Sequence, residues 1–207
     1  MRLVLLSIFV PLAALAEPPW TLEVSATELV VKVWKTGAGA ALAHDHVVRA
    51  SKFKGTARLD DAGTAESLGL ELVVDVLGLV PDEPEQRRRH HLPNTPVPES
   101  DRLKVQASLQ GEEQLDAAKF PTISFVVSKV FREESGALQC LGKLTLHGVT
   151  KELLFPIAVK TVERRVEGDA SVRFKTSEFG VKPYSAALGL IKNKDDVELV
   201  LHVVLAR

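Results

Sequence analysis

The feature that most constrains this chain is an alternation of apolar and other residues with a period of two, which runs through most of its length. In "TELVVKVWK" (27–35), Leu29, Val31 and Val33 share one face, because alternate side chains of a β-strand point to the same side. The pattern returns over residues 67–79, 122–130, 138–146, 153–159 and 197–205. These runs are separated by turn signals, among them "DDAG" (60–63) and "EGD" (167–169). Many short strands joined by turns predict an antiparallel β-sandwich or β-barrel.

Two segments depart from this pattern. Residues 81–99 contain five prolines, which argue against a central strand or a long helix, so we expect a long proline-rich surface loop there. Residues 102–110 alternate strictly, which favours a strand. The acidic start at 99–101 and the helix-forming residues of 110–120 favour a helix instead. The residues alone leave these two alternatives open.

The first sixteen residues have the composition of a secretory signal peptide. Arg2 precedes the apolar run "LVLLSIFVPLAALA" (3–16), which ends in the small-x-small sequence Ala14-Leu15-Ala16. We therefore expect cleavage after Ala16, a periplasmic or secreted protein, and a single mature domain over residues 17–207. The apolar run is short for a membrane span, so no span is expected after signal removal. A retained N-terminal anchor is the alternative.

Charge and cysteine content narrow the function. The chain has 26 Lys and Arg against 27 Asp and Glu, a net charge of −1, which is not the basic balance of a nucleic-acid-binding protein. Cys140 is the single cysteine, so an exported form has no internal disulfide and depends on its hydrophobic core. The neighbours of Cys140 alternate as in a strand, which favours a small buried side chain over a reactive thiol.

The stretch "HDH" (44–46) raises the question of a metal site. On a regular strand, His44 and His46 would point to the same side, as two ligands of a zinc-type ion require. A third ligand would have to come from His90, His91 or His147. In the structural alternative, these side chains bond to the turn of a hairpin, and Asp45 caps nearby amides. His-x-His pairs recur without a metal, so we favour the structural interpretation and expect no cofactor.

Two further features could contact the polar part of a ligand. Arg87, Arg88 and Arg89 form a basic cluster that suits an anionic headgroup, although a solvated charged loop is the simpler interpretation. His147 lies at the end of an expected strand, where it could contact a headgroup or fix the turn. The sequence contains no G-x-S-x-G, H-E-x-x-H, phosphate-binding loop or dinucleotide-binding motif, so no catalytic constellation emerges and we do not expect an enzyme.

The stretches "KFPTISF" (119–125) and "LGKLTLHGVTKELLFPI" (141–157) resemble the paired signatures of the YceI-like polyisoprenoid-binding family. A weaker similarity is "SEFGVKP" (177–183), and the F-x-G element "FKG" (53–55) stands in the expected order. The resemblance spans about residues 20–206. It implies an all-β fold with a minor helix, an antiparallel lipocalin-like barrel of about eight strands.

The resemblance also implies a function. The family holds long apolar ligands, such as isoprenoid quinone-type lipids or fatty amides, inside the barrel. A helix precedes the F-P-x-I-x-F motif in the family, which favours the helix over residues 101–113. The partner that we expect is an apolar lipid-like ligand, and a homodimer is an open alternative to a monomer. The side chains expected to line the barrel are Leu29, Val31, Val33, Leu70, Leu72, Phe125, Val127, Leu144, Leu146 and Phe155.

Overall fold

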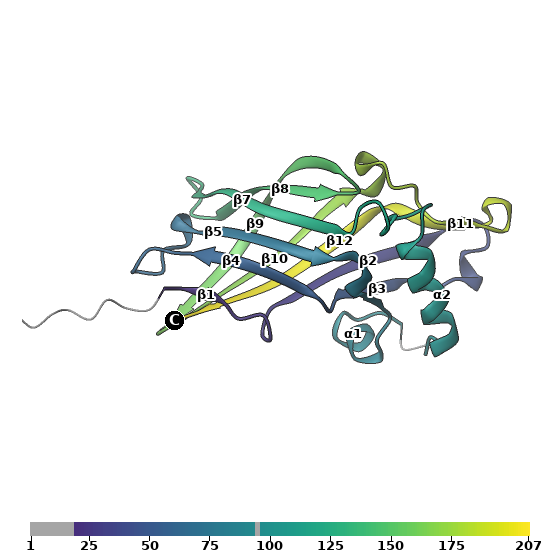
Figure 1. Cartoon of the computed structure of the whole chain (residues 1–207), viewed down its shortest axis with the longest axis horizontal. Coiled ribbons are helices and arrows are strands. Elements are labelled where there is room, and N and C mark those ends of the chain that lie inside the picture. The colour runs from purple at the N-terminus through teal and green to yellow at the C-terminus, as the bar shows by residue number, and fades with distance from the viewer. Residues whose placement is uncertain (1–18, 94–95) are drawn as a thin grey trace, which may run out of the picture.

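The computed structural model describes residues 19–93 and 96–207, so the predicted signal peptide (1–16) lies outside the described residues (Figure 1). The strands are β1 (Thr21–Leu22), β2 (Glu28–Thr36), β3 (His46–Ala50), β4 (Phe53–Arg58), β5 (Gly69–Asp75), β6 (Leu79–Pro81), β7 (Thr122–Arg132), β8 (Leu138–Leu146), β9 (Val149–Val162), β10 (Arg165–Lys175), β11 (Ser185–Ala186) and β12 (Ile191–Ala206). The α-helices are α1 (Pro84–Arg89) and α2 (Glu99–Gln110). Short 3-10 helices are η1 (Ala40–Leu42), η2 (Ala65–Ser67), η3 (Val76–Gly78), η4 (Thr176–Phe179) and η5 (Ala187–Gly189).

The sheet closes on itself through a bent hairpin. Hydrogen bonds join neighbouring strands in the order β4-β5-β7-β8-β9-β10-β12-β2-β3-β6. The two ends of this order are β4 and β6. β4 continues β3 across Ser51 and Lys52, and β6 continues β5 through η3, so each end strand is the continuation of a strand near the other end. The bent strands stay paired across the kink, because Ser51 N–H donates to the Gly78 carbonyl (2.8 Å) and Asp75 N–H donates to the Lys52 carbonyl (3.0 Å).

This topology confirms the predicted antiparallel barrel with minor helix. When β3–β4 and β5–β6 are each counted as one bent strand, eight strands form the ring in the described part of the chain. The remaining two strands, β1 and β11, are two residues long and pair with the two ends of β12. The strand pairs are antiparallel, as Figure 1 shows for the curled sheet.

The apolar faces point into the barrel, as the alternation predicts. On β5, Leu70 and Leu72 are buried while Glu71 between them is exposed. The wall of β8 carries Gly142 where a side chain would meet the ring of Phe125, because a Cβ there would lie 2.2 Å from Phe125 Cζ. The glycine therefore leaves space for an aromatic ring inside the barrel.

The prediction of a surface loop over residues 81–99 is wrong in part. Pro81 ends β6, and α1 begins three residues later at Pro84. Proline suits the first turn of a helix, because its missing N–H would have no partner there. The prolines thus exclude a long helix but permit a short one, and α1 buries the side chain of Arg87.

Residues 99–110 form a helix, which resolves the alternative that the residues left open. Its first turn contains Glu99 and Asp101, whose negative charges suit the helix N-terminus. Val105 and Leu109 are four residues apart and therefore share one face, which lies over one end of the barrel. Among residues 19–93 and 96–207, no helix is long and apolar enough to cross a membrane.

Candidate functional site

Four cavities follow one another inside the barrel and share wall residues. The distal cavity (≈ 70 Å³) lies near the β1 end of β12, and the central cavity (≈ 90 Å³) comes next. The broad cavity (≈ 170 Å³) follows, and the mouth cavity (≈ 160 Å³) lies beneath α2. Phe125 borders both the distal and the central cavity, Leu144 borders the central and the broad one, and Asn193 borders the broad and the mouth cavity. The cavities are therefore neighbours in one row, and a shared side chain lies between each cavity and the next.

All ten side chains predicted to line the barrel border at least one of these cavities. Six of them border only the distal or the central cavity: Leu29, Leu70, Leu72, Phe125, Val127 and Phe155. The other four border the broad cavity: Val31, Val33, Leu144 and Leu146. Their contact with a ligand stays a prediction, to which the proposal below returns.

The row is long. Asn193 in the mouth cavity and Leu205 in the distal cavity both belong to β12, at positions 193 and 205. At about 3.3 Å per residue these positions are about 40 Å apart along the strand. A strand tilt of roughly 40° reduces this to about 30 Å along the barrel axis. An extended hydrocarbon chain filling the row would thus match the full ~30 Å hydrocarbon core of a bilayer rather than one leaflet.

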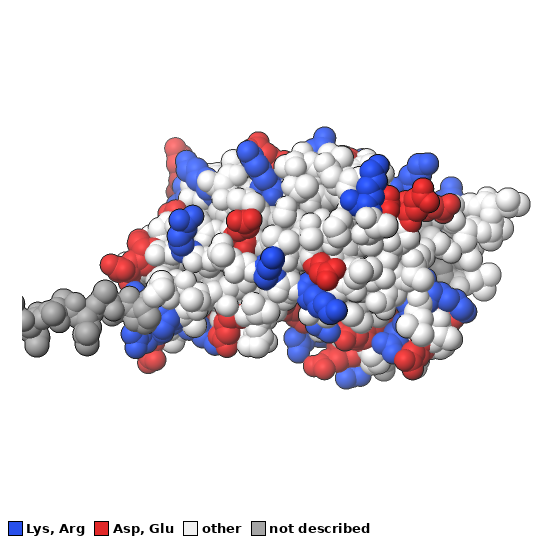
Figure 2. Space-filling model, in the orientation of Figure 1, with Lys and Arg blue, Asp and Glu red and all other residues white. Residues whose placement is uncertain are grey.

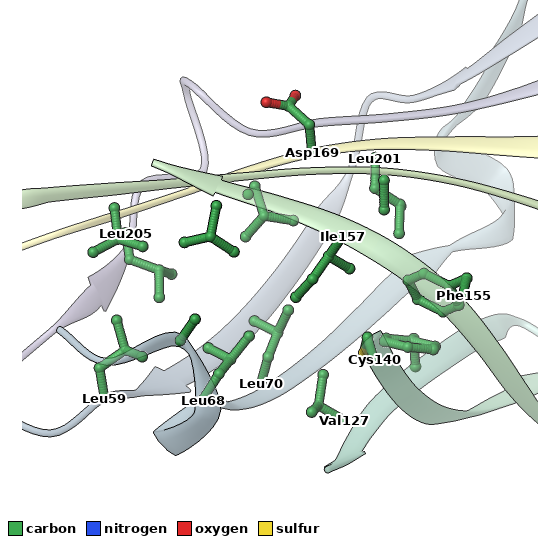
Figure 3. A pocket seen from close by; sticks show the side chains of 17 residues that line it. Leu59, Leu68, Leu70, Val127, Cys140, Phe155, Ile157, Asp169, Leu201 and Leu205 are labelled. Carbon is green, nitrogen blue, oxygen red and sulfur yellow. The ribbon is translucent and has the colours of Figure 1, made fainter. Parts of the chain in front are cut away.

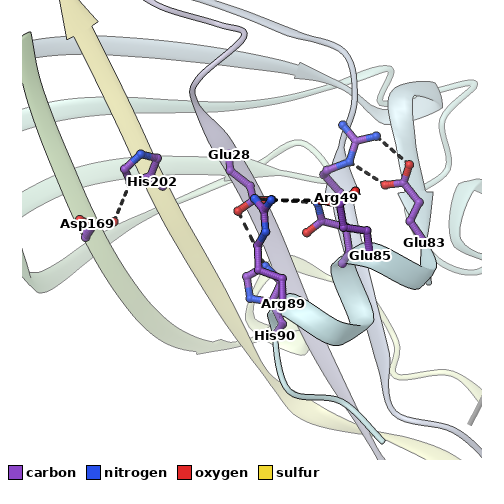
Figure 4. Close-up of polar contacts among 9 residues, drawn as sticks. Glu28, Arg49, Glu83, Glu85, Arg89, His90, Asp169 and His202 are labelled. Carbon is purple, nitrogen blue, oxygen red and sulfur yellow. Dashed lines mark hydrogen bonds and ion pairs between the residues drawn. The ribbon is translucent and has the colours of Figure 1, made fainter. Parts of the chain in front are cut away.

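The distal cavity is apolar. Figure 3 shows aliphatic and aromatic side chains converging on it, whereas the carboxylate of Asp169 points away. On the outside of the barrel, this carboxylate pairs with His202 Nδ1 at 2.8 Å (Figure 4). Cys140 belongs to the cavity wall, is 3% exposed, and its burial raises the pKa of the thiol to about 11. This confirms the prediction that Cys140 is a small buried side chain, and the cavity suits the tail of a hydrocarbon ligand.

The mouth cavity has a different character. Its apolar wall consists of Val33, Val48, Val105 and Leu109. Polar side chains also line it: His46 from β3, Lys104 and Ser108 from α2, Asn193 from β12, and Gln114 and Tyr184 from loops. His46 faces inward because it lies two residues before Val48, which lines three of the four cavities. The row of cavities therefore has one end that is almost wholly apolar and one end whose wall also contains polar side chains.

A buried ion pair holds His46 in place. The Asp82 side chain is fully buried and accepts hydrogen bonds from His46 Nδ1 (2.6 Å), Arg87 Nη1 (2.8 Å) and the Val47 N–H (3.2 Å). Burial raises the pKa of the Asp82 carboxyl, but the bonds from His46 and Arg87 outweigh it, so the pKa lies below its ordinary value. The carboxylate is thus ionised and accepts a hydrogen bond from the Nδ1–H of His46, so Nε2 is the ring nitrogen that this bond leaves free.

The structural interpretation of "HDH" is supported and the metal interpretation is not. His44 precedes β3, which begins at His46, so the two histidines do not lie together on one regular strand. Asp45 Oδ1 accepts the Lys35 N–H (2.9 Å), which confirms the predicted capping of a nearby amide. Within the described ranges, no three His, Cys, Asp or Glu side chains come together as an ion would require.

The basic cluster is divided by the fold. Arg87 is buried and also donates to the carbonyls of Asp45 (2.7 Å) and Pro93 (3.0 Å), so it braces α1 and cannot reach a headgroup. Arg89 pairs with Glu28 (3.1 Å) on the outside of the barrel (Figure 4). Arg88 is exposed. The three arginines therefore have different surroundings, and a contact of Arg88 or Arg89 with a headgroup stays a prediction.

His147 has the geometry of a turn residue. It adopts a left-handed backbone (φ 51) between β8 and β9, and its ring lies 4.4 Å from the ring of Phe120. A Cβ at Gly148 would lie 2.6 Å from Phe120, so this glycine is required for the contact. The stretches "KFPTISF" and "LHGVTK" thus meet at this turn, and their joint occurrence has a packing reason. His147 borders none of the four cavities.

The polar side chains of the mouth have little signal in the sequence. Asp82, Tyr184 and Asn193 are far apart in the sequence and belong to no motif. A weak signal existed at Asn193, since "KNKDD" (192–196) is a polar start to an otherwise apolar strand. The register of β12 with β2 shifts between Asn193 and Val197, which marks an irregularity of the barrel wall beside the mouth cavity.

Comparison with known proteins agrees with this architecture. The crystal structure of Burkholderia cenocepacia BcnA is 16% identical, with a TM-score of 0.65 over 88% of this chain and 98% of that chain. A Campylobacter jejuni YceI protein is 16% identical, with a TM-score of 0.58 over 77% of this chain and 84% of that chain. At such identity these structures show the fold alone. No curated protein matches the chain. The sequence model of the YceI-like domain matches residues 20–205, and the chain therefore belongs to the YceI-like family of polyisoprenoid-binding barrels.

Proposed function

We propose that this protein is an exported carrier that encloses one long-chain amphiphile, with its hydrocarbon tail toward the distal cavity and its polar head at the mouth. The observation that carries the proposal is the polarity of the row of cavities. The distal cavity is apolar, whereas His46, Asn193 and Tyr184 gather at the opposite end. A chain with one polar end matches this arrangement in a single orientation.

Burial of the tail provides the driving force. Each methylene group removed from water contributes roughly 0.8 kcal/mol, so a chain about 30 Å long needs few polar contacts. The length favours an isoprenoid or quinone-type lipid, or a long fatty amide, over an ordinary acyl chain that reaches only one leaflet deep. The role is storage or transfer of such a molecule, and no catalytic step is part of it.

The signal-like sequence of residues 1–16 supports export to the periplasm or the exterior, where such a carrier would cross water between membranes. N-terminal sequencing of the protein purified from its host tests the cleavage after Ala16. A chain that begins at Met1 and stays with the cytoplasmic fraction would refute export.

Lipid extraction and native mass spectrometry test the binding function. We expect one bound long-chain lipid per chain when the protein is purified from its own host. Saturable uptake of a fluorescent prenyl or long-acyl lipid by delipidated protein should accompany it. A protein that is empty as purified and shows no saturable uptake would refute the proposal.

A further inference from the structure

Two apolar loops extend the mouth end of the barrel. The first tip loop, "TGAGAALA" (36–43), joins β2 to β3, and the second tip loop, "PYSAALGLI" (183–191), leads into β12. Neither contains a charged residue. They lie side by side, since Gly39 N–H donates to the Leu190 carbonyl at 2.8 Å. Together they form the apolar tip, which lies at the opposite end of β12 from β1 (Figure 1).

The leucines of the apolar tip are exposed to solvent. Leu42 is 82% exposed, Leu188 107% and Leu190 54%, and Tyr184 beside them is 39% exposed. In Figure 2 the end of the molecule that these loops form carries no charged side chain on the face shown. Single exposed leucines are ordinary on a protein surface, but three on two adjacent uncharged loops form a patch that marks an interaction site.

The backbone also holds these side chains outward at a cost. Ala187 (φ 49) and Leu188 (φ 56, ψ 32) are consecutive non-glycine residues in the left-handed region, which side chains with a Cβ disfavour. Packing of the Leu188 side chain within the protein does not compensate for this conformational cost, because that side chain is fully exposed. Such an arrangement indicates that the loop is shaped for a contact outside the molecule.

Basic residues flank the apolar tip. Lys35 precedes the first loop, where its Nζ donates to the Ala43 carbonyl (2.8 Å), and Lys182 and Lys192 bound the second loop. Two acidic side chains beside the loops accept hydrogen bonds from backbone N–H groups: Asp45 from Lys35 and Asp195 from Ser177. Exposed leucines with lysines beside them match the interface of an anionic bilayer, where apolar side chains enter the acyl region and lysines meet the phosphates.

The position of the apolar tip relates it to the cavities. Tyr184 belongs to the second tip loop and borders both the broad and the mouth cavity, and Asn193 N–H donates to the Tyr184 carbonyl (2.9 Å). We propose that the apolar tip inserts into the surface of an anionic membrane and sets the mouth of the barrel against it. This contact would let a lipid pass between the bilayer and the barrel, and that role rests on the proposed function. The contact itself can be measured independently of it.

The test compares vesicle binding by matched variants of the protein. The variant Leu42→Ser/Leu188→Ser/Leu190→Ser removes the leucines of the tip, and Leu154→Ser/Val162→Ser removes exposed apolar side chains of β9 (59% and 51% exposed). In flotation with vesicles of phosphatidylethanolamine and phosphatidylglycerol, we expect the tip variant to bind at least about tenfold more weakly than wild type. The β9 variant should bind as wild type does.

A label gives a second measurement. The native Cys140 is buried, so a Leu188→Cys variant presents one accessible thiol for an environment-sensitive dye. Its emission should shift to shorter wavelength when vesicles are added. Equal vesicle binding by wild type and tip variant, or a wild type that ignores vesicles, overturns the proposal. In the second case, a wild-type dimer that the tip substitutions convert to monomers would identify the apolar tip as the contact with a second copy.

The two proposals fail separately. If extraction finds no lipid in the protein but vesicles still bind through the tip, the carrier function fails and the membrane contact stands. If lipid is found in wild type and in the tip variant alike while neither binds vesicles, the membrane contact fails and the carrier function stands.

Discussion

Replacement of Ala170 by Phe should shorten the chain that the barrel can hold. Ala170 lies on β10 in the wall of the distal cavity, where the added phenyl ring would occupy the ≈ 70 Å³ space. The matched control is Ala158→Phe. Ala158 lies on the neighbouring strand β9, where it pairs with Asp169 of β10, and its side chain is exposed. Both variants add the same ring to the same region of sheet, one inside the barrel and one outside.

The expected effect follows from the methylene groups that the ring displaces. A phenyl group takes the room of about four methylenes, which at about 0.8 kcal/mol each corresponds to roughly 3 kcal/mol. This is about a hundredfold increase in Kd for a chain long enough to reach the distal cavity. A shorter lipid that ends in the central cavity should bind both variants as it binds wild type.

The assay is titration of delipidated protein with a series of lipids of one headgroup and increasing chain length. The affinity of wild type and of Ala158→Phe should rise with length throughout, and that of Ala170→Phe should stop rising. Thermal unfolding checks that the variant is folded, since overpacking can cost about 1–3 kcal/mol. If the folded Ala170→Phe variant gains affinity with length as wild type does, the tail does not reach the distal cavity and the proposed orientation is refuted.

Three further predictions concern the wall and the mouth. Asp82→Asn leaves Arg87 buried without its carboxylate, so urea unfolding should show a loss of about 3–5 kcal/mol. Because the pKa of Asp82 is lowered in the folded state, its contribution to stability is present above the unfolded-state value (about 4) and is lost as pH falls through the folded-state value. Acid unfolding of the variant should therefore depend less on pH, and an unchanged profile would contradict the assignment. Gly142→Ala should cost roughly 1–3 kcal/mol in the same urea assay, because the new Cβ meets the Phe125 ring, and a second change, Phe125→Leu, should restore most of it. Cys140, with its pKa raised to about 11 by burial, should react with a thiol reagent near neutral pH only at the rate of unfolding, and an immediate reaction would refute its burial.

Much of the barrel could be predicted because one signal repeats along the whole chain. The period-two pattern on β2, β5, β7, β8 and β9 selects the strand and also its buried face, so the ten lining side chains could be named before their neighbours were known. The segment 102–110 shows the limit of the signal. Its alternation favours a strand, but the acidic first turn and the contact of Leu109 with the barrel end place it in a helix.

The polar mouth could not be predicted, because it depends on contacts between segments that no local pattern relates. The bond between His46 and Asp82 joins two positions 36 residues apart, and Arg87 becomes buried only because α1 folds onto the barrel. In the sequence, Arg87 is one of three consecutive arginines and is indistinguishable from its exposed neighbours Arg88 and Arg89. Burial, which separates their roles, is a property of the tertiary fold.

The place of β12 in the ring has a consequence for how the protein is made. β12 pairs with β10 and with β2, so that Leu201 lies opposite Leu29, and it also carries β1 near its end. The ring thus joins the first and last parts of the chain, a contact order that makes folding slow compared with helical proteins of this size. Until the sixteen residues of β12 have been synthesised, the remaining strands form an open apolar sheet with unpaired edges. Substitutions in β12 should therefore act mainly by increasing aggregation of this incomplete sheet. Their effect on the stability of the finished barrel should be smaller.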